Sequence, residues 1–280
     1  SNLNNIPAVN EIPIVPGTEK AILTLEDGKQ VELEKGRAYI NSKVNSDGEN
    51  LIYNREKSDK GKNIVYNYLT IPRGGQFFVQ LSDGTKVWLN SESKLKYPVS
   101  FDLDKTRNVE LLYGEAYFDV SESAKHNGAS FKVKTKVQDI EVLGTEFNVK
   151  SYNDDNIILT TLIEGKVKVS NGVVNKLLKP GFQTNINIKR NDINVFRVDV
   201  DNVVAWKNGF FSFEKERLED MLKTLSRWYS TKIIYENENK KDLIFSGVLK
   251  RTSSIEELLI KIEKTGRVQF KIDKKTITVK

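Results

Sequence analysis

Short segments in which apolar and polar residues alternate dominate the sequence between residues 20 and 206. In FKVKTKV (131–137) the odd-numbered positions hold apolar residues or threonine, and the even-numbered positions hold lysine. A period of two is typical of a strand with one buried face and one exposed face. KVWLN, AYFDV and EFNVKSY repeat the pattern further along the chain. We therefore expect many strands in this region, each half-buried.

Asx-Gly dipeptides separate these segments and predict hairpin turns. Such pairs favour type I′ turns, in which both central residues have positive φ. The polar segment 43–62 interrupts the pattern and is predicted to form a long loop. Together these signals predict an antiparallel structure, either a β-sandwich or a short β-solenoid. The dipeptides are Asp27-Gly28, Asp47-Gly48, Asp83-Gly84, Asn127-Gly128, Asn171-Gly172 and Asn208-Gly209.

A different spacing begins after Gly209. Apolar residues recur every three or four positions in 218–228 and again in 255–262, which indicates two amphipathic helices. Ser254 opens the second helix with a capping box, and Gly266 is expected to end it. With the strand patterns on either side, the order is β-α-β-β-α-β-β. This order predicts a small α/β domain with its helices packed on one sheet.

These patterns divide the chain into three parts. Residues 1–19 hold three of the six prolines and are expected to be an extended leader or tether. Residues 20–206 form the predicted β domain and 207–280 the predicted α/β domain, so the fold class is mainly β. Charge marks the same boundary, because 207–280 carry 17 basic and 11 acidic residues, whereas the rest carries 27 of each. The whole net charge of +6 therefore lies in the last part.

Composition excludes several kinds of chemistry. The chain has no cysteine, which removes disulfides, thiolate catalysis and the common zinc sites. The one histidine, His126, lies in the polar stretch SAKHNGAS and is expected to be exposed. No phosphate loop, metal-ligand spacing or nucleophile elbow occurs, and no apolar run is long enough to cross a bilayer. We expect no catalytic residue, no cofactor, no metal and no small-molecule substrate.

Three other functions stay open at this point. A hydrolase would need two carboxylates that meet in space, and the sequence singles out no pair. Nucleic-acid binding would suit the basic domain, but its lysines alternate with glutamates, as in EELLIKIEK, which indicates solvated helix faces. A carbohydrate-binding β module of a cell-surface protein would need exposed aromatic residues. Trp88 and Trp206 lie in apolar patterns that favour core packing, while Trp228 fits either a core or an interface.

Motifs from Thr70 to Gly181 resemble those of the FecR family. They are TIPRGGQFFVQLSDGTKVWLN, RNVELLYGEAYFDV, VLGTEFNVKSY, TTLIEGKVKVS and LKPG, in this order. The segment after Gly209 resembles the small secretin/TonB-type domain, called STN-like, that follows the FecR sensor in Bacteroidetes proteins. Within the motifs, the resemblance implies structural roles for Asp83, Gly84, Gly114, Glu115, Gly144, Glu164 and Gly165.

The resemblance implies a regulator rather than an enzyme. FecR-type proteins are single-pass inner-membrane anti-sigma factors whose periplasmic part senses a TonB-dependent outer-membrane transducer. A cytoplasmic region, absent from this chain, would hold the extracytoplasmic-function sigma factor. The resemblance thus places this chain in the periplasm as the sensor part of such a regulator. Its expected partner is the periplasmic signalling domain of the transducer, and no nucleic acid is expected.

Two sets of residues are candidates for this role. Partner binding is assigned to basic and aromatic residues of the last domain: Arg227, Trp228, Tyr229, Lys250 and Arg251. The aromatic pair among them is equally compatible with core packing. Some family members cleave themselves at a Gly-Thr bond, and Gly144-Thr145 is the matching bond here. The alternative is a tight turn between two strands that the threonine hydroxyl caps.

Overall fold

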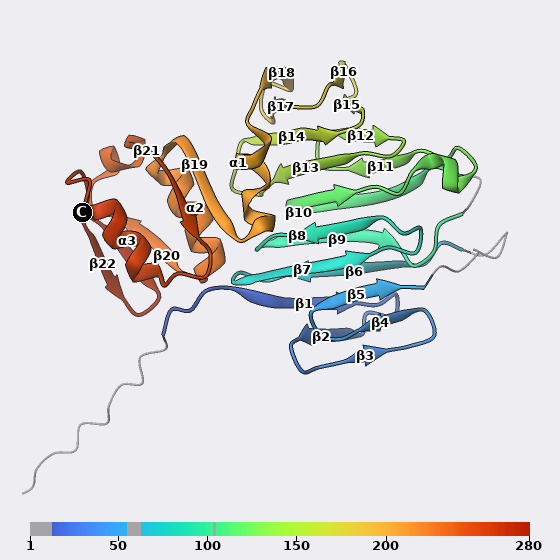
Figure 1. Cartoon of the computed structure of the whole chain (residues 1–280), viewed down its shortest axis with the longest axis horizontal. Helices are drawn as coiled ribbons and strands as arrows, with labels where there is room; N and C mark the ends of the chain where they lie inside the picture. Colours follow the sequence, from blue (N-terminus) through green and yellow to red (C-terminus); the bar gives the residue numbers. More distant parts are fainter. Residues whose placement is uncertain (1–12, 55–62, 103–104) are drawn as a thin grey trace, which may run out of the picture.

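The computed structural model describes residues 13–54, 63–102 and 105–280, which form two modules (Figure 1). The larger one, called here the β module, holds the described strands between Thr18 and Arg197. The smaller C-terminal module runs from Phe210 to Val279. Most of the predicted leader and the end of the predicted 43–62 loop lie outside the described residues.

Two long sheets make up the β module, and most neighbouring strands in them are antiparallel, as predicted. The first sheet contains, in spatial order, β2 (Gln30–Glu34), β1 (Thr18–Thr24), β6 (Tyr66–Ile71), β9 (Ser93–Pro98), β10 (Arg107–Asp119), β11 (Phe131–Lys134), β12 (Asp139–Val142), β15 (Val167–Ser170) and β16 (Asn175–Leu178). The second contains β3 (Tyr39–Ile40), β4 (Val44–Ser46), β5 (Asn50–Tyr53), β7 (Gly75–Gln80), β8 (Lys86–Leu89), β10 again, β13 (Glu146–Ser151), β14 (Ile157–Glu164), β17 (Phe182–Asn187) and β18 (Asp192–Arg197).

The inward side chains of both sheets form a single apolar core. Phe131 and Val133 of β11 are buried while Lys134 is exposed, as the alternation in the sequence predicts. Phe147 and Val149 of β13 face them from the second sheet as members of the same core. Burial of each large apolar side chain contributes about 1.5–3 kcal/mol, so this core is the main force that holds the sheets together.

Strand β10 belongs to both sheets. Its first half pairs with β9 and β11, and its second half pairs with β8 and β13. The register shifts between Leu111 and Tyr113, next to Gly114, whose φ is +101°. A Cβ atom on Gly114 would lie 2.2 Å from the Oγ atom of Ser93. Only glycine therefore fits where the strand passes from one sheet to the other.

Four of the six Asx-Gly pairs join neighbouring strands, but the predicted turn type is wrong at these four, because none of their Asx residues has a positive φ. In the β7–β8 turn, Gly84 has a φ of +87°, but Asp83 is not among the residues with positive φ. The backbone N–H of Gly84 donates to the carbonyl oxygen of Leu81, as in a type I turn followed by a glycine bulge. The Asp83 carboxylate accepts from the N–H of Thr85, which favours this turn over type I′.

Two segments that we expected to be irregular contain strands. Within 43–62, β4 and β5 pair with each other, and β5 lies beside β7. Val44, Leu51 and Tyr53 anchor this hairpin in the core, but three buried apolar residues among polar neighbours leave little signal in the sequence. Thr18 and Glu19 belong to the predicted leader, yet they pair with β7 as the start of β1.

The C-terminal module has the predicted order of elements but not the predicted single sheet. Its helices α2 (Leu218–Tyr229) and α3 (Ile255–Glu263) lie between two small sheets (Figure 1). Residues 225–229 are all buried, so the end of α2 is covered on every side. One sheet contains β19 (Phe210–Arg217) and β21 (Ile244–Lys250), and the other contains β20 (Lys232–Tyr235), β23 (Thr276–Val279) and β22 (Phe270–Asp273). The short helices α1 (Val200–Val204) and η2 (Ala205–Asn208) connect the modules.

One buried ion pair lies at the ends of central strands of the β module. Arg107 and Asp83 are each 1% exposed in their side chains, with Nη1 and Oδ2 2.7 Å apart. Arg107 also donates to the carbonyl oxygens of Ser121 and Ala129. The pair joins the start of β10 to the β7–β8 turn, which gives the family-motif residue Asp83 its structural role.

Replacement of Arg107 by methionine should lower the free energy of unfolding by about 3–5 kcal/mol, because Asp83 would keep a buried charge without a partner. The double variant Arg107→Met/Asp83→Asn should lose less than the sum of the single changes. Arg190→Met is the matched control, since the Arg190–Asp192 pair is exposed and should contribute under about 1 kcal/mol. Urea unfolding of the variants measures these values, and equal losses for Arg107→Met and Arg190→Met would contradict the account.

Candidate functional site

The two modules meet at a surface, called here the seam, that buries two arginines of the C-terminal module. Arg227 lies in the last turn of α2 and Arg251 just after β21, and each is 3% exposed. A guanidinium group stays charged in proteins, and burial of an unpaired charge is costly. Partners for both arginines come from the β module, so the seam depends on them.

Arg227 is surrounded by acidic and aromatic groups of the β module. Its Nη2 atom lies 2.6 Å from Oδ1 of Asp154, and its Nε atom lies 3.4 Å from Oε2 of Glu92. The guanidinium also stacks on the ring of Tyr152, 3.7 Å from the centroid. Burial alone would lower the pKa of Arg227, but Tyr152, Asp154 and Asp155 together raise it above its ordinary value. The charge of Arg227 is therefore stabilised at the seam.

Arg73 reaches across the seam in the opposite direction. It lies in the β6–β7 turn and donates to the Oγ atom of Ser226 at 2.9 Å and to the carbonyl oxygen of Thr231 at 3.0 Å. Its other nitrogen pairs with Glu92 at 2.8 Å. Glu92 has a backbone φ of +59°, which is uncommon for a residue other than glycine. This backbone conformation holds a carboxylate that pairs with both Arg73 and Arg227.

Arg251 is the first member of a series of buried polar side chains that are linked by hydrogen bonds. Its Nη2 atom donates to Oδ1 of Asn90 at 3.0 Å, and the amide of Asn90 donates to Glu115 at 2.9 Å. The other carboxylate oxygen of Glu115 accepts from Asn148 at 3.0 Å, and Asn148 in turn accepts from the indole of Trp206 at 3.2 Å. Burial lowers the pKa of Arg251 to about 10, so it remains charged at neutral pH.

This chain of groups gathers three motifs that are far apart in the sequence. Asn90 ends KVWLN, Glu115 is the second residue of GEAYFDV, and Asn148 lies in EFNV. Sequence analysis assigned a structural role to Glu115 but missed both asparagines. Their presence in the same motifs was the only available signal. The motifs therefore meet at the place where the β module receives Arg251 from its neighbour.

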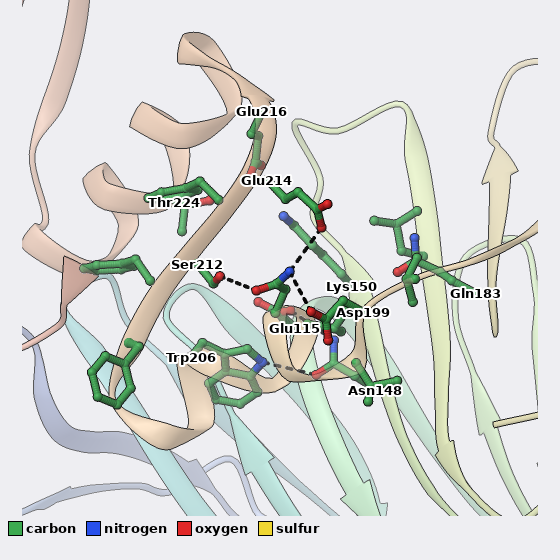
Figure 2. Close-up of a pocket in the computed structure, with 18 of the residues that line it drawn as sticks. Glu115, Asn148, Lys150, Gln183, Asp199, Trp206, Ser212, Glu214, Glu216 and Thr224 are labelled. Carbon is green, nitrogen blue, oxygen red and sulfur yellow. Dashed lines mark hydrogen bonds between the residues drawn. The ribbon is translucent and has the colours of Figure 1, made fainter. Parts of the chain in front are cut away.

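A cleft of about 990 Å³ opens beside the seam (Figure 2). Asn202 of α1 lines this cleft, and it donates to Asp199 and Glu214 and accepts from Ser212 at 2.6 Å. These bonds tie the connecting helix to β19. Burial raises the pKa of Glu216, which also lines the cleft, although Lys150 opposes the shift. The polar side chains here bond largely to one another, which is typical of a structural junction.

The structure buries four of the five residues to which we assigned partner binding. Arg227, Trp228, Tyr229 and Arg251 lie in the seam or the core of the C-terminal module, and Lys250 is exposed. The indole of Trp228 donates to the carbonyl oxygen of Arg251, and the hydroxyl of Tyr229 donates to that of Ser253. Partner binding by this set stays a prediction, and the four buried residues could reach a partner only through an opened seam.

The Gly144-Thr145 bond lies in the turn between β12 and β13. Gly144 has a φ of +149°, and a Cβ atom there would lie 3.0 Å from the Cα atom of Glu122. The Thr145 hydroxyl donates to the carbonyl oxygen of Lys166 at 3.0 Å. Gly165, with a φ of +94°, packs against the same bond, since its Cβ would lie 2.9 Å from the Gly144 oxygen. These contacts are those of the second alternative, a tight turn that the threonine hydroxyl caps.

Other candidate residues have structural surroundings. His126 is buried rather than exposed, and its Nε2 atom lies 2.9 Å from the Oγ atom of Ser121. Trp206 and Trp228 are buried, and Trp88 is half-buried beneath the Nζ atom of Lys207. Glu164 is exposed at the end of β14. Within the described ranges, no group of three acidic or histidine side chains could hold a metal ion. No described helix is long and apolar enough to span a membrane.

Two family models match the chain. One, for the FecR protein, matches residues 67–168, and another, for the C-terminal part of FecR, matches residues 210–279. The first range contains Asn90, Glu115 and Asn148, and the second contains Arg227 and Arg251. Both sides of the seam therefore lie inside family regions. A comparison with curated proteins gave no match.

Two crystal structures of a candidate anti-sigma factor from Parabacteroides distasonis ATCC 8503 are similar to this chain. In both cases the sequences are 29% identical, and the match covers 76% of this chain and 98% of the other. The TM-score is 0.69 for each. With family matches on both modules and these structural neighbours, the chain belongs to the FecR family of signalling regulators of the anti-sigma type.

Proposed function

We propose that this chain is the periplasmic sensor part of a transmembrane anti-sigma factor. In this role it relays a signal from a TonB-dependent outer-membrane transducer to an extracytoplasmic-function sigma factor through protein contacts. Family membership supports the role of regulator. The observation that carries the finer proposal is the placement of positive charge, which makes the C-terminal module a docking surface for an acidic protein partner.

The outer face of the β20–β23–β22 sheet gathers this charge. Its inner face packs on the helices through Ile277 and Val279. Lys232, Lys271 and Lys275 are exposed on or beside the outer face, and none of the three has an ion pair among the described residues. Unpaired lysines on an open sheet face attract an acidic surface, mainly by raising the association rate. The signalling domain of the transducer would dock here.

Carbohydrate binding has less support. Stacking of a sugar ring needs an accessible aromatic face, and the described structure buries Trp206 and Trp228. Trp88 is only half-buried, but Lys207 lies over its ring at 4.5 Å and its other neighbours are Phe78 and Tyr117. The tryptophans thus have structural partners of their own.

Reversal of the three unpaired lysines should weaken docking. We expect Lys232→Glu/Lys271→Glu/Lys275→Glu to lower the association rate for the signalling domain at least about tenfold at low salt, because long-range attraction is lost. The difference from wild type should shrink as salt rises. Stopped-flow or biolayer measurements with the periplasmic signalling domain of a TonB-dependent transducer from the same organism provide the test.

The matched control reverses three exposed lysines of the β module, Lys134, Lys168 and Lys179, which also lack ion pairs among the described residues. This variant should bind like wild type. If the signalling domain bound neither wild type nor variants, the proposed relay would be wrong. Equal losses in both variants would show that docking depends on overall charge rather than on this sheet.

For the Gly144-Thr145 bond, we expect a single intact species. The Thr145 hydroxyl is engaged with the Lys166 carbonyl, so it is not free to attack the preceding peptide carbon. Intact-mass analysis over several days at 37 °C should show one mass for the wild type and one for Thr145→Ala. A fragment pair that splits between Gly144 and Thr145 in wild type, but not in Thr145→Ala, would establish self-cleavage.

A further inference from the structure

The chain that leads into β1 crosses the seam before it enters the β module. Ile14 packs against the apolar core of the C-terminal module. Gly17 lies so close to the indole of Trp228 that a Cβ atom there would be 2.5 Å from Cε3 of the ring. At the next residue, the N–H of Thr18 donates to the carbonyl oxygen of Gly74 at 3.1 Å. The segment Ile14–Gly17 is thus held by the C-terminal module, directly before it joins the first sheet.

Trp228 is positioned by the same contacts that close the seam. Its indole N–H donates to the carbonyl oxygen of Arg251 at 2.9 Å, and the Arg251 guanidinium lies 3.8 Å from the ring centroid. Arg251 in turn donates to Asn90 of the β module. On the other side, the N–H of Gly74 donates to the carbonyl oxygen of Arg227 at 2.7 Å. The residue that receives Gly17 is therefore bonded directly to groups that close the seam.

We propose that the C-terminal module retains the segment Ile14–Gly17 only while the seam is closed, and that displacement of this module releases the segment. The inference rests on the proposed function in one respect, namely that a protein partner acts on the C-terminal module. The leader and the docking module are in direct contact, so a signal between them need not pass through the eighteen strands of the β module. The closed seam thus holds the segment Ile14–Gly17 in place.

Energetic coupling of this kind is reciprocal. If a closed seam favours the bound segment by a given factor, then the bound segment favours the closed seam by the same factor. A partner that binds only the open form shifts both equilibria together. A substitution that weakens binding of the segment Ile14–Gly17 should therefore also favour opening of the seam, even though none of the hydrogen-bonded polar residues of the seam is altered.

The first test enlarges Gly17. In Gly17→Val the new side chain must displace Trp228, so proteinase K should cut between Ile14 and Gly17 at least tenfold faster than in wild type, as followed by intact mass. Cleavage at a site that opens transiently reports the population of the open form. Gly247→Val is the matched control, because Gly247 has no positive φ and a Cβ atom there meets nothing within 4 Å. Its cutting rate should equal that of wild type.

The second test locks the seam. The Cβ atom of a side chain at Gly74 would lie 3.6 Å from Cβ of Ser230, within the range for a disulfide. The chain has no cysteine of its own, so Gly74→Cys/Ser230→Cys introduces the only pair. The oxidised variant should be cut in the segment at least tenfold more slowly than the same variant after reduction. Equal rates in the two states would show that the segment detaches without opening of the seam, and would overturn the proposal.

A third measurement separates this proposal from the proposed function. Addition of the signalling domain of a TonB-dependent transducer from the same organism should speed cutting of wild type and leave the oxidised variant unchanged. If the domain binds but the cutting rate of wild type stays constant, docking stands and release of the segment is refuted. If the domain does not bind, the proposed partner is wrong, while the two tests on the isolated chain still decide whether the seam retains the segment.

Discussion

The structure depends on the need of two buried guanidinium groups for partners. Arg227 and Arg251 carry fixed charges into a surface that excludes water, and groups of the β module surround both. Inside this surface each charge needs hydrogen bonds and acidic or polar neighbours, which offset the cost of its removal from water. The two modules therefore have one preferred relative position, which apolar contacts alone would specify less sharply.

A seam of this composition can open as well as close. Separated charges regain water, so parting the modules costs less than exposure of an apolar interface of similar extent. The polar contacts of the seam form two groups, which connect different parts of the structure. In the first group, Glu92 pairs with Arg73 and Arg227. In the second, Glu115 is linked through Asn90 to Arg251 and through Asn148 to Trp206 of the connecting helix η2. Because both groups of contacts join the same two modules, a change at one end of the seam also affects the other end.

Sequence patterns predicted the parts of this fold that depend on local spacing. The alternating strand at Phe131–Lys134 and the order of elements after Gly209 are confirmed, although the strand ends three residues before the pattern does, because burial of one face imposes a period on neighbouring residues. Contacts between distant segments left no such period. The burial of Arg227 and the meeting of Asn90 with Asn148 depend on which turns lie opposite one another, and a basic helix end looks the same in sequence whether it faces water or a carboxylate.

The strand that both sheets share has a consequence for how the protein forms. Neither sheet is complete without β10, whose partners extend from Lys86 of β8 to Ser151 of β13. Contacts of such long range must close large loops before they contribute stability, which slows folding. A chain that crosses a membrane as an extended thread would reach its folded form only after β13 had emerged. Until then the early strands present unpaired edges, which expose the incomplete chain to aggregation.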